Sequence, residues 1–287
     1  MKIFEASELT WKELTKRVVN SARDGDLLGW AAQLAFFLML AFFPLLLFLM
    51  LLLGYLTEDR TQLRDGLLFY LSSLAPVSAS QLIATTVEET SFAKGGGKLT
   101  FGLVAALWAA SGGMRAMSKA INVAYGVKQN RAWWHERLLA LCLTLALGAL
   151  IIVALTLLLY GSDIAEQIAA AFGLDSAFTL LWKLVQYPIA VLFVLLAFNA
   201  IYHFAPNIEG KRWQWLTPGA LVGVALWLTV SIAFRQYLRQ FSLIKTTYGS
   251  FGAVIALMLW CYLTGIVILI GGTINAVISR AKQDIAE

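Results

Sequence analysis

The chain has 287 residues, of which 60% are hydrophobic and 14% are charged, and its mean hydropathy is +0.74. Soluble domains are about 45–50% apolar, so this composition excludes an ordinary soluble protein and indicates a polytopic membrane protein. The net charge of +5 does not by itself indicate a nucleic-acid partner, because membrane proteins carry excess Lys and Arg on their cytoplasmic loops. Cys142 and Cys261 lie in apolar runs and indicate neither a disulfide framework nor a metal cluster.

The first 29 residues are polar and predict a cytoplasmic interfacial segment with an amphipathic helix over 5–25. Thr10-x-x-Glu13 has the spacing of a capping box. Trp11, Leu14 and Val18 then share one helical face, which we expect to lie on the cytoplasmic leaflet. A cleaved signal peptide is not expected, because the first apolar run is too long for one and lacks a cleavage site.

Residues 30–55 form the first predicted span, since they contain no charge and exceed the ~20 residues that cross a bilayer as a helix. Residues 56–98 predict an extracytoplasmic segment with amphipathic helices. The three glycines between Lys94 and Lys98 indicate a flexible joint. Their spacing does not match the phosphate loop G-x-x-x-x-G-K-[ST], so nucleotide binding is not predicted there.

Residues 99–114 are apolar but short, and topology decides that they form the second span. The stretch 115–137 holds five basic residues and one acid, which predicts a basic cytoplasmic helix or loop. If 99–114 did not cross, this stretch would lie outside. Ser111, Arg115, Lys119 and Asn122 share one helical stripe, so the span is expected to continue as a helix that leaves the bilayer.

The remaining spans are predicted at 138–160, 184–202, 213–234 and 251–278. The result is an all-α bundle of six transmembrane helices in one membrane domain, 1–287, with both termini in the cytoplasm. Cytoplasmic segments then carry 14 basic residues and outer segments seven. The outer segment 235–250 is the exception, because Arg235, Arg239 and Lys245 have no acidic neighbour within it. These bases either contact an anionic headgroup or fix the depth of the fifth span.

Several blocks together resemble the YihY/BrkB family of bacterial inner-membrane proteins. They are LWAASGGMRAMSKAINVAYGVKQNRAWW at 107–134, AAQLAFF at 31–37 followed by Phe43-Pro44, WLTPGA at 215–220, Tyr248-Gly249-Ser250, and Trp260, Tyr262, Gly271 and Asn275. The likeness covers most of the chain in order. Phe36 stands where the family commonly has tyrosine, and Thr273 stands where a glutamate is expected. The loss of that carboxylate argues against a proton-coupled role there.

The resemblance implies a multi-pass inner-membrane protein of unsettled activity. Family members have been described as virulence or serum-resistance factors, were once labelled ribonuclease BN, and have been suspected of handling envelope lipids. The residues argue against a nuclease, because His135 and His203 are isolated and the acids are scattered through loops. The six apolar runs also contain no Asp or Glu. We therefore predict no catalytic residue, no metal and no cofactor.

Two hypotheses remain open. In the first, the protein transports or flips an anionic amphiphile or envelope lipid along a groove between spans. In the second, it is a non-transporting scaffold or assembly factor whose basic stretch docks a partner or an anionic lipid. Both name membrane lipids as partners and exclude nucleic acid, and both leave homo-oligomerisation open. The candidate substrate-binding residues are Gln33, Arg115, Lys119, Asn122, Asn199, Arg235, Arg239, Tyr248 and Asn275.

Overall fold

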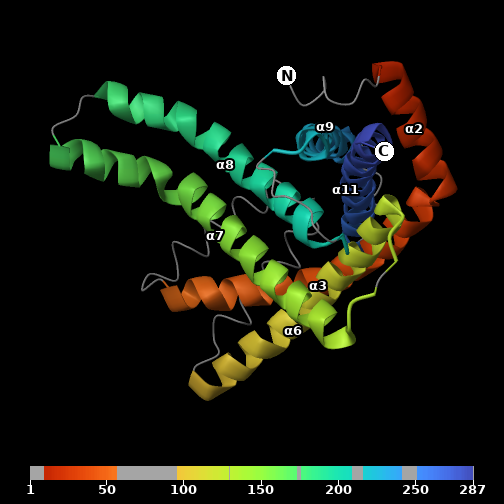
Figure 1. Ribbon diagram of the computed structural model, residues 1–287. Coiled ribbons are helices and arrows are strands. Elements are labelled where there is room, and N and C mark those ends of the chain that lie inside the picture. The colour runs from red at the N-terminus through yellow and green to blue at the C-terminus, as the bar shows by residue number, and fades with distance from the viewer. Residues whose placement is uncertain are drawn as a thin grey trace.

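The computed structural model describes residues 10–56, 96–128, 130–172, 176–208, 216–240 and 251–286 (Figure 1). Within these ranges every regular element is an α-helix, so the predicted all-α fold is confirmed there. The helices are α2 (Trp11–Asp24), α3 (Leu27–Leu56), α6 (Gly96–Tyr125), α7 (Trp133–Phe172), α8 (Ser176–Phe204), α9 (Pro218–Gln240) and α11 (Phe251–Ala286). The predicted outer segment 56–98 lies almost wholly outside the described residues, as does Tyr248.

Four stretches of the described helices are long and apolar enough to cross a membrane. They are Trp133–Leu158, Leu184–Phe204, Pro218–Leu238 and Val254–Ala281. A fifth is reached if Lys12–Asp24 and Leu27–Phe42, which meet at a bend of 66°, are counted as one span. The four correspond to the last four predicted spans, while six spans and cytoplasmic termini stay predictions. The predicted second span forms part of α6, which continues without a break to Tyr125.

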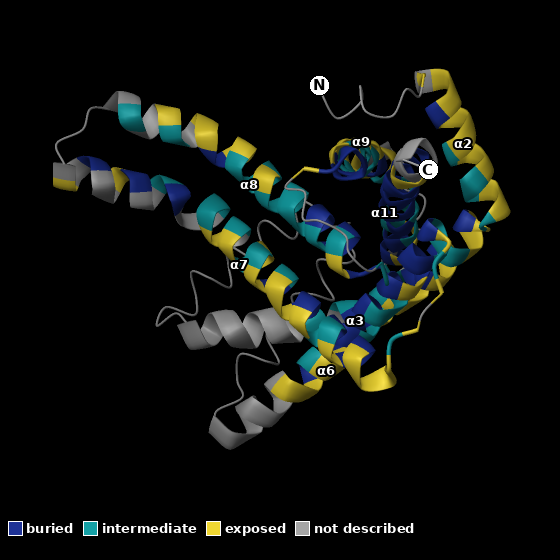
Figure 2. Ribbon diagram, viewed as in Figure 1, coloured by how far each residue is buried: buried dark blue, intermediate teal, exposed yellow. Residues whose placement is uncertain are grey.

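Helix α11 is the centre of the packing. Its residues 271–278 are all buried, and it contacts α3, α9, α6 and α2 (Figure 2). Small residues permit the close approaches, because a Cβ on Gly265 would meet the backbone of Ala31 in α3. A Cβ on Gly271 would collide with the Tyr202 hydroxyl and the Gly219 carbonyl oxygen. The pairs α3–α6 and α7–α8 pack side by side, and α6 crosses the beginning of α7 (Figure 1).

The N-terminal amphipathic helix packs against protein. The predicted capping box is present, with the Thr10 backbone N–H donating to Glu13 Oε2 at 3.3 Å. Leu14, which is buried, and Val18 pack against Ile274 and Val277 of α11. Helix α11 therefore covers at least part of this apolar face, and the position of the helix on the cytoplasmic leaflet stays a prediction.

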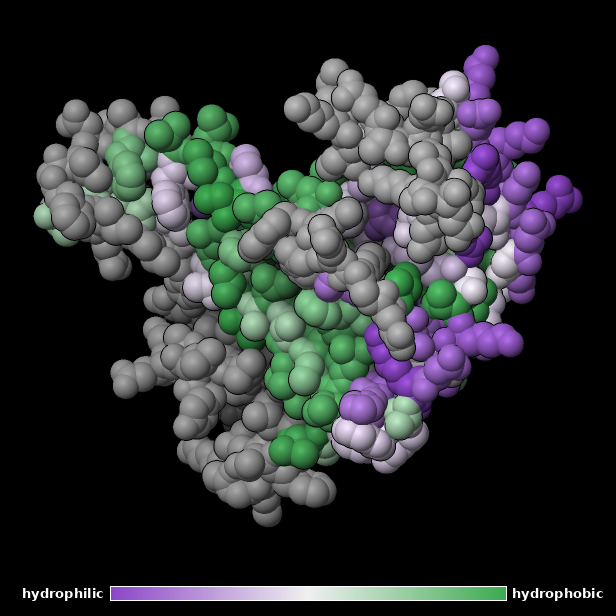
Figure 3. Space-filling view, viewed as in Figure 1, coloured by the Kyte–Doolittle hydropathy of each residue, from purple (hydrophilic) through white to green (hydrophobic). Residues whose placement is uncertain are grey.

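The exposed surface separates by polarity. Hydrophilic side chains gather along α2 and around the connection from α6 to α7, and hydrophobic ones gather over α7 and α8 (Figure 3). Since α2 also packs against the C-terminal half of α11, the two ends of the described chain lie on the same polar side.

Candidate functional site

Three charged side chains meet where α6 crosses the beginning of α7, and we call Arg115, Glu136 and Arg137 the Arg115 cluster. Arg115 Nη2 donates to Glu136 Oε2 at 3.3 Å. Arg137 Nη2 donates to the Trp108 carbonyl oxygen at 2.6 Å, and its guanidinium lies 3.8 Å from the centre of the Trp108 ring. Glu136 is 7% exposed and Arg137 8%. The cluster therefore holds two positive charges and one negative charge in a largely buried place.

The cluster does not satisfy all of its own polar atoms. Arg115 Nε, Glu136 Oε1 and Arg137 Nε are buried and have no hydrogen-bond partner in the structure. Buried polar atoms are normally paired, so two donors and one acceptor remain available here. The Arg115 side chain is 25% exposed, so the cluster lies at the edge of the buried region.

Large apolar side chains with high exposure lie near the cluster in the sequence, on the two helices that form it. Trp108 in α6 and Trp133, Trp134 and Leu138 in α7 are each at least half exposed. Tryptophan is enriched at the level of lipid headgroups, where its ring is apolar and its N–H is polar. This composition is typical of a site at headgroup depth.

The end of α6 is tied to two distant helices. Gly126 has a φ of +65°, and the Val127 N–H donates to the Asn122 carbonyl oxygen at 2.9 Å, as in a Schellman C-cap. Arg280 of α11 donates to the Tyr125 carbonyl oxygen at 2.7 Å. Asn122 Oδ1 accepts the Asn207 backbone N–H at 2.7 Å. The predicted site residue Asn122 therefore joins α6 to the end of α8.

Arg131 has a similar connecting role in the loop between α6 and α7. Its Nη1 donates to the Ala205 carbonyl oxygen at 3.2 Å and its Nη2 donates to that of Pro206 at 2.9 Å. These carbonyls lie at the C-terminal end of α8, where a cation is favoured by the helix dipole. Burial lowers the pKa of Arg131, and the nearby Glu136 carboxylate opposes that shift. The guanidinium is therefore a structural cap of α8.

A third polar group lies between α8, α9 and α11, and we call Asn199, Thr217 and Asn275 the Thr217 cluster. Thr217 precedes α9, and its Oγ1 accepts the Ala220 N–H at 3.3 Å as an N-cap. The same hydroxyl donates to Asn199 Oδ1 at 3.0 Å and accepts from Asn275 Nδ2 at 3.0 Å. Asn275 Oδ1 also accepts the Gly219 N–H at 2.8 Å. These bonds satisfy the first turn of α9 from a neighbouring helix.

The predicted site residues thus fall into different surroundings. Arg115 belongs to the Arg115 cluster, Asn199 and Asn275 meet in the Thr217 cluster, and Asn122 contacts the end of α8. Gln33 in α3, Lys119 in α6 and Arg235 in α9 are exposed. Arg239 is in the last turn of α9, and Tyr248 lies outside the described residues. Whether these residues bind a substrate stays a prediction.

Sequence reasoning missed Glu136, Arg137 and Thr217. For Thr217 a signal existed, because Thr followed by Pro218 is a typical N-cap and first helical residue. For Glu136 the only signal was its place as the single acid of the basic stretch 115–137. Its pairing with a residue 21 positions away depends on the helix crossing, which the sequence pattern does not specify.

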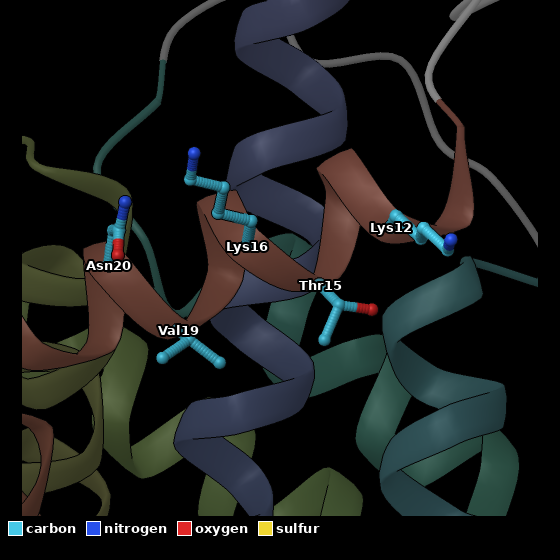
Figure 4. Close-up of a pocket in the computed structure, with 5 residues that line it drawn as sticks. All are labelled: Lys12, Thr15, Lys16, Val19 and Asn20. Carbon is cyan, nitrogen blue, oxygen red and sulfur yellow. The ribbon is translucent and has the colours of Figure 1, made fainter.

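Other features of the described residues give no further site. In the described ranges, no three His, Cys, Asp or Glu side chains are placed to hold a metal ion. Cys142 and Cys261 are free thiols. A shallow surface pocket is lined by Lys12, Thr15, Lys16, Val19 and Asn20 of α2. Their side chains point to different sides and do not converge on one point (Figure 4).

The long apolar helices and their polar ends define a multi-pass helical membrane protein of bacterial type. The chain belongs to the BrkB family, because residues 18–287 match the family described as Virulence factor BrkB. The predicted resemblance is confirmed. No solved structure matches the chain.

Relatives of known name agree with this assignment. The chain is 36% identical over 253 residues to YfkH of Bacillus subtilis, a protein named as ribonuclease-like, and the match covers 88% of this chain and 90% of that protein. It is 26% identical over 219 residues to a UPF0761 membrane protein of Ralstonia nicotianae, covering 76% of this chain and 47% of the relative. A UPF0761 membrane protein of Nitrosospira multiformis is 26% identical over 212 residues, covering 74% and 48%. The chain thus spans about half the length of these two UPF0761 relatives.

Proposed function

We propose that this protein transports or flips an anionic amphiphile, such as an envelope lipid, between the two faces of a bacterial membrane. The observation that carries the proposal is the Arg115 cluster, in which two buried or partly buried guanidiniums lie near one carboxylate that bonds only Arg115. An uncompensated buried charge is costly and is commonly a mark of function in membrane proteins. The excess positive charge and the exposed tryptophans fit a ligand with an anionic head and an apolar body.

The proposed path begins at the Arg115 cluster and ends at the far end of α9. Gln33, Lys119 and Arg235 are exposed and so can be reached by a lipid headgroup from the bilayer. Arg235 and Arg239 are one turn apart in the sequence of α9, and we propose that one headgroup contacts both. Tyr248 is a further candidate from the sequence, whereas both polar groups of the Asn275 amide are already bonded to Gly219 and Thr217.

The test is a lipid-movement assay with the full-length protein in sealed vesicles that carry fluorescent anionic or zwitterionic lipids. We expect headgroup-dependent movement in the wild type and a decrease of about tenfold or more in Arg115→Ala and Arg235→Ala. Lys128→Ala is the matched control, because Lys128 is exposed in the α6–α7 loop and outside the proposed path. Arg115→Lys retains the charge and should retain part of the activity. No movement of any anionic lipid by the wild type would refute the proposal.

A second candidate is a non-transporting scaffold or assembly factor, acting alone or as a homo-oligomer. The observation that favours it is that Asn122, Asn199 and Asn275 bond to groups of other helices, which is how polar residues hold a static bundle. A photo-crosslinker in place of Lys128 or Arg131 should then capture a defined partner while lipid movement is absent. Failure to capture a partner in cells, together with lipid movement, would exclude it.

Catalysis and nucleic-acid binding do not belong to either proposal. The name of YfkH mentions a ribonuclease, and nucleases commonly use clustered acids and histidines to hold metals or to exchange protons. Here His135 stacks on Trp134 at the start of α7, and His203 contacts Phe204 at the end of α8. Incubation of the purified protein with RNA is expected to give no cleavage above that of a mock preparation.

A further inference from the structure

The unpartnered atoms of the Arg115 cluster specify what a ligand must offer. Arg115 Nε and Arg137 Nε are donors, and Glu136 Oε1 is an acceptor. A carboxylate accepts hydrogen bonds and cannot donate them, while a guanidinium only donates. A ligand that satisfies all three atoms must therefore carry an acceptor and a hydrogen-bond donor close together. A simple anion such as a sulfate ester carries only the acceptor.

The formal charge of the cluster narrows the choice of acceptor group on the ligand. Among the three side chains of the cluster, Arg115 and Arg137 against Glu136 give one net positive charge, which matches a monoanion. The nearby Arg131 guanidinium is bonded to the carbonyls at the end of α8, where the helix dipole favours its charge. A phosphate monoester carries about −1.5 to −2 charges near neutral pH, and its second charge would lie beside the buried Glu136 carboxylate. A phosphodiester carries a single charge and avoids this repulsion. The charge count favours a diester over a monoester.

The same charge count narrows the choice of hydrogen-bond donor on the ligand. An ammonium group on the headgroup could donate to Glu136 Oε1, but it would make the ligand zwitterionic and leave the positive charge of the site uncompensated. A hydroxyl group donates without changing the ligand charge. Because Glu136 is more than nine-tenths buried, compensation by bulk water is restricted. The hydroxyl therefore matches the cluster better than the ammonium.

We infer that the Arg115 cluster binds a lipid whose headgroup is a phosphodiester bearing a hydroxyl group, of the phosphatidylglycerol type. The phosphate lies against Arg115 and Arg137, the hydroxyl donates to Glu136 Oε1, and the exposed Trp108 and Trp133 contact the apolar part of the lipid. This inference rests on the proposed function and names the ligand of the same site.

The test compares four lipids with identical acyl chains for binding to the full-length protein in detergent, by competition against fluorescent phosphatidylglycerol. Phosphatidylethanol has the same diester without the hydroxyl, phosphatidic acid is a monoester, and phosphatidylethanolamine is zwitterionic. Phosphatidylglycerol is expected to bind about tenfold more tightly than phosphatidylethanol, the order of one hydrogen bond to a charged group. It should also bind more tightly than the other two. Equal binding of phosphatidylglycerol and phosphatidylethanol, or tightest binding of phosphatidic acid, would overturn the inference.

A variant tests the role of the carboxylate. Glu136→Gln raises the net charge of the cluster to two and should reverse the order of phosphatidylglycerol and phosphatidic acid. Glu166→Gln, at an exposed position of α7, removes the same charge elsewhere and should leave the order unchanged. An unchanged order in folded Glu136→Gln would also overturn the inference. If that variant does not fold, the four lipids on the native protein still decide the question.

Binding and transport can fail separately. Selective binding of phosphatidylglycerol without lipid movement in vesicles would support the ligand assignment and refute the proposed transport. Movement of anionic lipids without selectivity for the hydroxylated diester would support transport and refute the ligand assignment.

Discussion

Substitution of Asn275 by alanine should weaken the packing of α9 against α11. The Asn275 side chain accepts the Gly219 N–H at 2.8 Å and donates to Thr217 Oγ1 at 3.0 Å. Gly219 is the second residue of α9, so its N–H has no acceptor within its own helix. Asn275→Ala thus removes these two bonds, together with the side-chain hydrogen bond between Asn275 and Tyr125, and leaves a buried amide N–H unpaired.

The expected loss can be bounded from these contacts. Interhelical hydrogen bonds in membrane proteins average about 0.6 kcal/mol each, so the two bonds alone account for roughly 1.2 kcal/mol. An unpaired buried donor costs about 1–3 kcal/mol, and Gly219 is buried and packed against the Gly271 carbonyl. The second effect is therefore the larger, and we expect the free energy of unfolding to fall by about 2–3 kcal/mol.

The measurement is reversible unfolding of the detergent-solubilised protein in increasing mole fractions of SDS, followed by circular dichroism. Thr229→Val is the matched control, since the exposed Thr229 hydroxyl bonds only the Ala225 carbonyl of its own helix at 2.8 Å. It should change the free energy of unfolding by less than about 0.5 kcal/mol. Thr217→Val combined with Asn275→Ala should cost less than the sum of the two, because they share a bond. A loss in Asn275→Ala no larger than that in Thr229→Val would show that these bonds do not stabilise the packing of α9 on α11.

Three other predictions test separate parts of the packing. Gly271→Ala should lower the free energy of unfolding by about 1–3 kcal/mol, because its Cβ would collide with the Tyr202 hydroxyl. Gly112→Ala is the control, since no heavy atom lies within 4 Å of the new Cβ. It should leave the free energy of unfolding unchanged or raise it by about 0.5–1 kcal/mol. Arg131→Gln should speed amide hydrogen exchange at the end of α8, measured by mass spectrometry, and unchanged exchange would contradict the capping role. Leu14→Asp should separate α2 from α11 and speed trypsin cleavage within α2, whereas an unchanged cleavage rate would show that this packing is dispensable.

Hydropathy predicted where the helices lie but not where they end. The predicted span 138–160 lies inside α7, which continues to Phe172. Polar residues such as Asp163 and Glu166 end the apolar run, but they do not interrupt the helix. At α9 the predicted span begins too early, because the apolar run from 213 includes residues before the helix. Thr217 and Pro218 mark the true beginning, and local capping chemistry would have found it.

The candidate site was only partly predictable for a different physical reason. Periodicity indicates which residues share a face of one helix, so it found Arg115 and Asn122. It does not give the angle at which two helices cross, and that angle brings Glu136 to Arg115. The apolar face of α2 shows the same limit, since an amphipathic pattern is equally compatible with a lipid surface and with α11.

The basic stretch that fixed the predicted topology has more than one physical use. Arg131 caps α8, and Arg137 bonds the α6 backbone, so insertion rules alone do not account for them. Neutral carbonyls satisfy their hydrogen bonds without compensating their charge. Glu136 compensates one guanidinium at most, and its carboxylate is already bonded to Arg115. The positive charge that remains beside exposed tryptophans is thus expected to attract an anion, which is why the Arg115 cluster, and not the well-paired Thr217 cluster, is where ligand binding should first be sought.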